Sequence, residues 1–292
     1  MTFSLVGRCE RTGAVGAVIA SASMAVAARC AAVRAGAGAV CSQSTTDPRL
    51  RGAVLDAMAA GQGADGALTA VVTQAPDVAY RQLAVADAAG GSACYTGELA
   101  LGEAGHVHMA GAAAAGNLLA SREVPAAMLA AFAGAADEDL GDRLVAALRA
   151  GLAAGGEVTP VRSAGLLIAD TEPWPVTDLR VDWDGDPVGR LAGLWAAWQP
   201  QAALYVQRAL HPAEVTELCL AWPDERRGRG RSWPDRAVHL LRRGLPGDRP
   251  VAARRGRGRG PAPVGLRGGR GELVGHDLPG PGAVQRPVVD QC

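Results

Sequence analysis

The sequence predicts an α+β protein, a four-layer αββα sandwich in which two stacked, mainly antiparallel sheets carry helices on their outer faces. Two observations carry this prediction. Apolar segments of strand length occur in pairs joined by short turns, which is typical of antiparallel hairpins. Segments with helical spacing also occur in pairs that alternate with the strands, and we find no fixed repeat of the kind that builds a solenoid.

Three strands are expected at the start of the chain. Residues 2–8 (TFSLVGR) and 14–21 (AVGAVIAS) are apolar, and the segment between them supplies charge and a glycine, so we expect a hairpin. Residues 35–44 (AGAGAVCSQS) predict a third strand. Within it, Gly36 and Gly38 indicate close approach of another layer.

Two helices are expected next. Asp47 is a good N-cap, Pro48 suits the first helical position, and the helical spacing stops at Gly61. A second helix ends at Pro76.

The remainder continues the alternation. Residues 80–97 predict two strands around a Gly-Gly turn, and residues 106–117 predict one strand that leads into a turn. Two helices are then expected, over residues 122–135 and 137–155. A hairpin of residues 163–170 and 176–183 follows, and residues 186–210 are expected to form the final helices.

Composition divides the chain into two parts. All 29 basic residues are Arg, so no lysine is available as a Schiff-base nucleophile, a general base or a charged neighbour. From Ala221 to Cys292 there are 15 Arg and 7 acidic residues, a net charge of +8, which leaves −8 for the rest. We therefore expect a domain over residues 1–212 and an Arg/Gly/Pro-rich tail over residues 213–292.

The tail admits three interpretations. Its composition buries too little apolar surface to offset chain entropy, which favours an unstructured extension. A frame shift in a GC-rich gene would produce the same composition. A nucleic-acid-binding tail is the third interpretation, but only Trp222 and Trp233 interrupt the arginines, so no stacking platform is evident and we do not expect such a partner.

Cysteine spacing favours a reducing compartment. The six cysteines form no C-x-x-C pair and no disulfide framework, so we expect buried or incidental free thiols and a cytoplasmic location. The apolar stretch 14–28 is too short for a membrane span and continues into arginines, so we expect no membrane association.

Thr2 is the candidate nucleophile. Initiator methionine is normally removed before a small residue, and a free N-terminal threonine carries a hydroxyl nucleophile and an amine base in one residue. A strand that merely begins with threonine would have the same sequence, so this residue alone leaves both interpretations open.

Several ordered motifs resemble one family. These motifs are TFSLVGR (2–8), AVRAGAGAVCSQSTTDPRLRGAVLDAMAAG (32–61), AAGNLLAS (114–121), LVAALRAGLAAGG (144–156), RSAGLLIAD (162–170) and VTDLRVDW (176–183). Together, up to about Pro212, they resemble the bacterial and archaeal domain of unknown function 1028, which is grouped with the N-terminal nucleophile (Ntn) hydrolase superfamily. The resemblance implies the αββα sandwich and leaves the substrate open.

The resemblance implies how Thr2 would act. Its hydroxyl would attack an amide carbonyl while its own α-amine, with an ordinary pKa of about 7.7–8.0, accepts the proton. Superfamily members such as proteasome subunits lower that pKa with a lysine. Because this chain has none, Arg34 is the substitute that we nominate.

Polar residues near the expected cleft are candidates for oxyanion stabilisation and substrate binding. Asn117 is the best side-chain donor for an oxyanion, although it could simply be a turn residue. Gln43 and, more weakly, Ser23 follow strands and could orient substrate or cap neighbouring elements. Arg162 and Ser163 open a strand near the same cleft, where they could also be a solvated strand end.

The remaining patterns do not predict a metal or cofactor. His106 and His108 lie on one face of a strand without a third ligand at suitable spacing, and the acidic run 178–186 lacks the EF-hand pattern. We therefore expect no cofactor. The predicted function is an Ntn-type amidohydrolase with a small amide or peptide as substrate; the alternative is a non-catalytic binding or assembly module on the same fold, and a homo-oligomer is left open.

Overall fold

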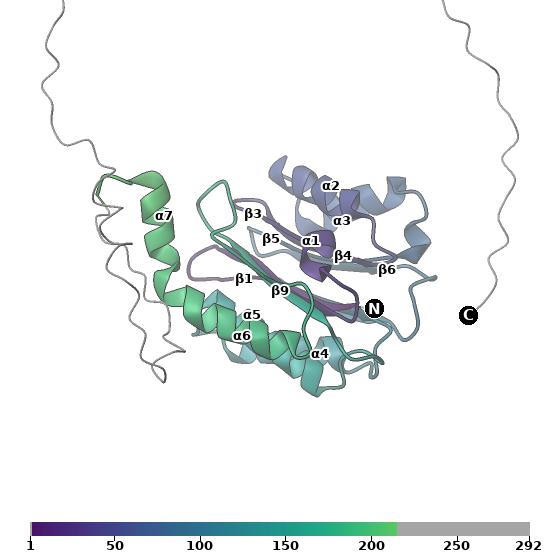
Figure 1. The fold of residues 1–292 in the computed structure, drawn as a ribbon. Helices are drawn as coiled ribbons and strands as arrows, with labels where there is room; N and C mark the ends of the chain where they lie inside the picture. Colours follow the sequence, from purple (N-terminus) through teal and green to yellow (C-terminus); the bar gives the residue numbers. More distant parts are fainter. Residues whose placement is uncertain (1, 215–292) are drawn as a thin grey trace, which may run out of the picture. The chain divides into compact units, whose positions relative to one another are not determined.

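The computed structural model describes residues 2–214, which form two antiparallel sheets (Figure 1). Sheet A has the order β10-β9-β2-β1-β8-β7, and sheet B has the order β3-β4-β5-β6. The strands of sheet A are β1 (Thr2–Arg8), β2 (Val15–Ser21), β7 (Gly105–Met109), β8 (Ala112–Asn117), β9 (Ser163–Ala169) and β10 (Thr177–Val181). Those of sheet B are β3 (Ala31–Arg34), β4 (Gly38–Ser44), β5 (Arg81–Asp87) and β6 (Ser92–Thr96).

Helices cover the outer face of each sheet. In Figure 1, α2 and α3 lie against sheet B, whereas α4, α5 and α6 lie on the far side of sheet A. The helices are α1 (Val26–Cys30), α2 (Pro48–Ala59), α3 (Ala64–Gln74), α4 (Val124–Gly134), α5 (Leu140–Ala153), α6 (Pro187–Trp198) and α7 (Ala202–Leu210), with short 3-10 turns at Val78–Tyr80 and Gln199–Gln201. The predicted four-layer sandwich is therefore confirmed.

The layer between the sheets is built mainly from small side chains. Ala17, Ala39, Ala84, Ala113 and their neighbours are fully buried there, with a few larger residues such as Ile19 and Val6. Small side chains let the two sheets approach closely. The larger apolar residues, among them Phe3, Phe132 and Leu144, pack instead between sheet A and its helices.

Most of the predicted elements are confirmed. The hairpin β1–β2, the paired helices α2 and α3, and the hairpin β9–β10 occur where the pattern placed them. Asp47 caps α2 as expected: its carboxylate accepts from the N–H of Arg49 at 3.0 Å.

The third strand was predicted three residues too long, because β4 begins at Gly38 and the prediction began at residue 35, and the strand before it was missed. Residues 31–34 form a separate strand, β3, which pairs antiparallel with β4, and Gly36 lies in the turn between them at φ +69° with open space where a Cβ would be. The prediction of close approach was therefore wrong for Gly36. It was right for Gly38, where an added Cβ would lie 2.8 Å from the Met58 side chain of α2.

The segment 106–117 was also predicted incorrectly, as one strand leading into a turn. It forms most of a hairpin, in which β7 and β8 are joined at Ala110 and Gly111, and Gly111 has φ +75°. Alanine has a low intrinsic strand propensity, so the run AAAAG (112–116) did not predict a second strand. Burial between sheet B and the α4 layer imposes the extended conformation, because only small side chains fit on both faces.

No helix among the described residues is long and apolar enough to cross a membrane. The cysteines in the same part of the chain (Cys9, Cys30, Cys41 and Cys94) are all unbridged. The predicted boundary near residue 212 lies at the end of the described range, and the predictions for the Arg/Gly/Pro-rich tail fall outside it.

Candidate active site between the sheets

A row of polar side chains crosses four neighbouring strands at one end of sheet A. Thr2 of β1 pairs with Asn117 of β8, its hydroxyl lies beside that of Ser21 on β2, and Ser21 pairs with Ser163 of β9. All four side chains are at least 96 % buried. Since directly opposed residues share a face of a sheet, this row replaces at one end the alanines that fill the inter-sheet layer elsewhere.

Sheet B presents a matching row. Gln43 of β4 pairs with Gln82 of β5, and Gln82 pairs with Thr96 of β6. Gln43 and Gln82 are completely buried. Their amides meet groups of sheet A, so the two polar rows face each other across the sandwich.

Hydrogen bonds join the two rows into one network. The Ser4 hydroxyl donates to Oε1 of Gln43 at 2.7 Å, and Nε2 of Gln43 donates to Oε1 of Gln82 at 2.9 Å. Nδ2 of Asn117 donates to the same Gln82 oxygen at 3.1 Å. The side chains of Gln43 and Gln82 are hydrogen-bonded in this way without a charged group.

Two backbone carbonyls fix the orientation of the network. Nε2 of Gln82 donates to the carbonyl oxygens of Gly116 and Gly105, at 2.9 and 3.2 Å, and to the hydroxyl of Thr96 at 3.0 Å. Because carbonyl oxygens can only accept, the NH₂ group of Gln82 must face them, and its Oε1 is then directed towards Asn117. Asn117 donates to this oxygen through its own NH₂ group. Oδ1 of Asn117 is then left buried, without a hydrogen-bond partner in the part of the chain that the structure describes.

The network reaches the surface at His106. The Thr96 oxygen lies 2.7 Å from Nδ1 of His106, and His108 makes a longer contact of 3.3 Å with Ser92. Both rings are on one face of β7, as the spacing predicted, and that face meets β6. Burial, with the neighbouring His108, lowers the pKa of His106.

Thr2 begins the central part of sheet A. Its side chain is on the same face as Ser4, because residues two apart in a strand share a face, and it is 4 % exposed. The Thr2 and Ser21 hydroxyl oxygens are 3.5 Å apart, the outer limit of a hydrogen bond, and Ser21 also accepts from the N–H of Ser23 at 3.0 Å.

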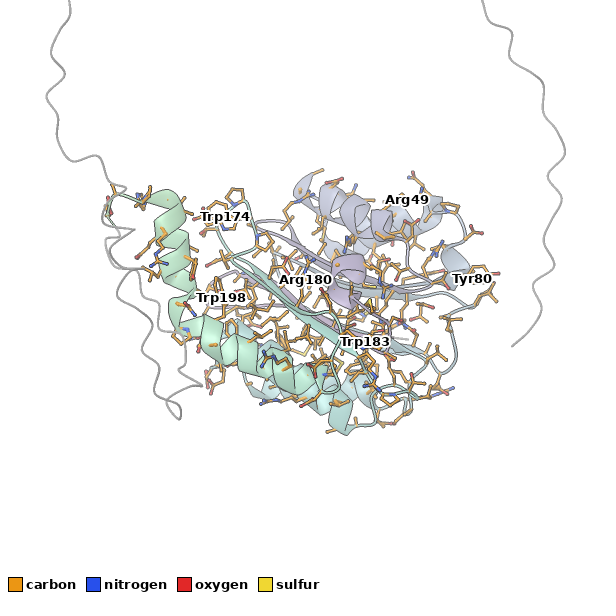
Figure 2. The ribbon with its side chains drawn as sticks, in the orientation of Figure 1. Arg49, Tyr80, Trp174, Arg180, Trp183 and Trp198 are labelled. Carbon is orange, nitrogen blue, oxygen red and sulfur yellow. The ribbon has the colours of Figure 1, made fainter. Side chains whose placement is uncertain are left out.

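The other predicted residues of this region hold the loop after β2. The Ser163 hydroxyl donates to the carbonyl oxygen of Ser23 at 2.5 Å and accepts from the N–H of Val26 at 3.2 Å. Ser23 takes part through its backbone. The N–H of Arg162 donates to the carbonyl of Ser21. Its guanidinium lies 5.9 Å from the ring of Trp183, an exposed residue that Figure 2 labels.

Arg34 is not brought to this cluster. It pairs with Gly38, at the opposite end of β4 from Gln43, and five residues of strand separate the two by about 17 Å. Its guanidinium instead forms a 2.8 Å ion pair with Asp56 on the surface. The nomination of Arg34 as the group that tunes Thr2 therefore has no support in the geometry.

Glu157 is an acidic residue of this region that the sequence pattern did not indicate. Two glycines in the left-handed region, Gly155 (φ +122°) and Gly156 (φ +58°), end α5 and turn the chain so that Glu157 bridges to Leu119. Its Oε2 accepts from the N–H of Ala22 at 3.0 Å, whereas Oε1 is buried and has no hydrogen-bond partner among the described residues. Burial raises the pKa of Glu157 to about 7.

Strained backbone surrounds the same end of the sandwich. Ser44 (φ +69°) follows Gln43, Leu118 (φ +50°) follows Asn117, and Ala25 (φ +52°) lies in the loop that Ser163 holds. Left-handed conformations are costly for residues with a Cβ, and they persist where the surrounding structure imposes them, often at functional sites.

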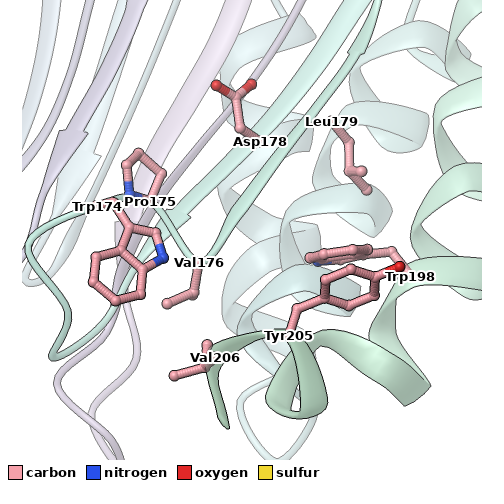
Figure 3. A pocket seen from close by; sticks show the side chains of 8 residues that line it. All are labelled: Trp174, Pro175, Val176, Asp178, Leu179, Trp198, Tyr205 and Val206. Atoms are coloured by element: carbon pink, nitrogen blue, oxygen red, sulfur yellow. The ribbon is translucent and has the colours of Figure 1, made fainter. Parts of the chain in front are cut away.

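A separate cavity of about 350 Å³ lies elsewhere (Figure 3). The rings of Trp198 and Tyr205 lie on one side of it, with their centroids 5.0 Å apart and their planes tilted by 34°. Residues 174–176 form another wall. Asp178, whose carboxylate points away from these rings in Figure 3, is paired with Arg180. The strand registers put this cavity at the end of sheet A opposite Thr2.

The described residues do not offer the ligand set of a metal site. Within residues 2–214, no group of three His, Cys, Asp or Glu side chains comes together. The polar rows offer hydroxyls and amides, and Glu157 adds a carboxyl group at the same end of sheet A, a set suited to hydrogen bonding with a polar organic substrate.

Comparison with known proteins agrees with the fold. The family model described as "Family of unknown function (DUF1028)" matches residues 2–191. The crystal structure of a protein from Silicibacter pomeroyi, assigned to the same family, is similar to the chain with a TM-score of 0.63 and 32 % identity, over 68 % of this chain and 85 % of that one. No curated protein matches the sequence. The chain belongs to the DUF1028 family of unknown function.

Proposed function

We propose that the chain is an Ntn-type amidohydrolase whose nucleophile is Thr2, exposed by removal of Met1, and whose substrate is a small amide or peptide. The observation that carries this proposal is the place of Thr2. It starts a central strand with its hydroxyl directed into the layer between the sheets, among Asn117, Ser21 and a buried amide network. Packing of the core alone does not explain so many buried polar groups at one end of the sandwich, because burying polar groups is costly.

The chemistry would proceed through an acyl-enzyme. As the Thr2 oxygen bonds to the amide carbon, its proton passes to the Thr2 α-amine, and the resulting ammonium donates it to the departing amine nitrogen. Water then attacks the ester in the same manner, which releases the acid and restores the hydroxyl. The second N–H of Asn117 Nδ2 is available to the oxyanion, since only one is directed to Gln82.

The test begins with intact mass, because retention of Met1 leaves Thr2 without a free amine and excludes the mechanism. Processed protein is then treated with a β-lactone, an electrophile that acylates N-terminal threonine, and is screened for hydrolysis of an amide and dipeptide library. Thr2→Ala should fold and lose both reactions. Thr73→Ala, at an exposed position on α3, is the matched control and should keep both.

The alternative, a binding or assembly module on the same fold, would give a different result. Processed wild-type protein would then neither form the adduct nor hydrolyse any library member. Its polar rows would serve to fix the register of the two sheets.

A further inference from the structure

Glu157 closes the end of sheet A in front of Thr2. Strand β1 lies between β8 and β2 in the sheet. The backbone of Glu157 bridges to Leu119, just beyond the end of β8, and its carboxylate reaches the N–H of Ala22, just beyond the end of β2. The residue therefore spans the two neighbours of β1 at the end where β1 begins.

Two hydrogen-bond acceptors remain unsatisfied at this place. Asn117 is completely buried and Glu157 is 93 % buried, and among residues 2–214 neither Oδ1 of Asn117 nor Oε1 of Glu157 has a hydrogen-bond partner. Buried polar atoms without partners are rare in native proteins and are costly. Oδ1 of Asn117 can only accept, and so can Oε1 of Glu157 when the carboxyl group is ionised, so a single group that satisfies both atoms in that state must be a donor.

No side-chain cation fills this role in the described part of the chain. None of the ion pairs there involves Glu157. Burial raises its pKa, and two influences oppose this rise: the N–H of Ala22 and the positive charge of the chain's N-terminus. The chain also has no lysine. After removal of Met1, the α-ammonium group would belong to Thr2, the residue that pairs with Asn117, and it has three N–H donors.

We propose that Glu157 and Asn117 together hold the α-ammonium group of Thr2 after Met1 is removed, with Glu157 as a positioning residue that takes the place of a lysine. This inference rests on the proposed function. A lysine lowers the pKa of the amine, whereas a carboxylate raises it, so the two devices differ in sign. With Glu157 the amine is held in place as an ammonium and becomes a base only at a more alkaline pH.

The absence of lysine makes the amine directly measurable. The Thr2 α-amine is the single primary amine of the processed chain, so competitive acetylation with isotopically labelled acetic anhydride, read by mass spectrometry between pH 5 and 10, gives its pKa. We expect Glu157→Gln to lower that pKa by about one pH unit or more. Glu123→Gln, at the exposed start of α4, is the matched control and should leave it unchanged.

Equal amine titrations in wild-type protein and Glu157→Gln would overturn the proposal. If Glu157→Gln does not fold, the wild-type protein provides a second measurement. Protein that keeps Met1 can be made in the presence of a methionine aminopeptidase inhibitor. It should lose more stability between pH 5 and pH 8 than the processed protein, because only the processed protein has the Thr2 ammonium beside Glu157. Identical losses would also overturn the proposal.

These outcomes are separable from those of the proposed function. A processed protein whose amine titration depends on Glu157, but which hydrolyses nothing, supports the positioning role and contradicts the hydrolase. A protein that hydrolyses amides with an amine insensitive to Glu157 supports the hydrolase and contradicts the positioning role.

Discussion

The hydroxyl of Ser4 donates a 2.7 Å hydrogen bond to Oε1 of Gln43, and this contact links the central strand β1 of one sheet to β4 of the other. Both side chains are completely buried. The contact is the first step of a network that continues through Gln82 to Asn117. The polar end of the sandwich therefore depends on pairs that bridge the sheets.

Ser4→Ala should destabilise the protein by about 1–3 kcal/mol, because it leaves a buried oxygen of Gln43 without a donor. Urea unfolding measures the loss. Thr69→Ala, on the exposed face of α3, is the control and should change stability by about 0.5 kcal/mol or less. A loss for Ser4→Ala no larger than that of the control would show that the contact between the sheets contributes nothing.

Gln82→Glu should destabilise the protein more as pH rises. The present Nε2 donates to three oxygen atoms, and a carboxylate there would face them with no proton to donate. The folded-state pKa of the introduced carboxyl is thus raised above its unfolded value of about 4.3, so stability falls as pH rises from that value. We expect a loss of about 3 kcal/mol or more at pH 8.

The control for this charge effect is Gln82→Met, which removes the same hydrogen bonds without adding a titratable group. Its cost should be the same at pH 5 and pH 8. Thermal melting at the two pH values compares both variants, and a pH-independent loss for Gln82→Glu would contradict the orientation assigned to the network.

Ala25→Gly should stabilise the protein, although glycine normally weakens folded structure. Ala25 has φ +52° and ψ +44°, a left-handed conformation that costs a residue with a Cβ about 1–2 kcal/mol. Removing the Cβ relieves this cost but increases the entropy of the unfolded chain, so we expect a net gain of about 0.5–1 kcal/mol. Ala130→Gly, at an exposed helical position of α4, should lose about 1 kcal/mol. The same sign for both changes would show that Ala25 is not strained.

The fold was largely predictable because alternation and helix caps are local signals. The hairpin of residues 2–8 and 14–21 follows from apolar runs and one turn, and Asp47-Pro48 marks the start of α2. The segment 106–117 was read incorrectly because alanine favours a strand only when two layers enclose it, and that enclosure is a tertiary property.

The candidate site was predictable only in part. Thr2 begins a strand, Asn117 ends one, and Gln43 is next to last in a third. The structure pairs Thr2 with Asn117 and links Asn117 to Gln43 through Gln82. Arg34 was nominated on residue type alone, and strand register carries it to the other end of β4. Glu157 has no local signal, because its place depends on the turn at Gly155 and Gly156 and on a bridge to a distant segment.

Glu157 should make the stability of the unprocessed protein fall with increasing pH. Burial raises the pKa of Glu157 in the folded state from 4.5 to about 7, so between these values the folded state binds more protons than the unfolded state. The contribution of Glu157 to stability is therefore greatest below about pH 4.5 and declines until about pH 7, by an amount on the order of 3 kcal/mol.

Glu157→Gln in the same Met1-bearing protein should remove most of this decline, since the amide keeps the shape and cannot ionise. Thermal unfolding at half-unit steps from pH 4.5 to pH 8 compares the two proteins, and Glu123→Gln controls for the loss of one surface charge. The difference between wild type and Glu157→Gln should grow up to about pH 7 and then stay constant. A constant difference across the whole range would mean that Glu157 ionises as readily in the folded chain as in the unfolded one, and that the end of sheet A in front of Thr2 is open to water.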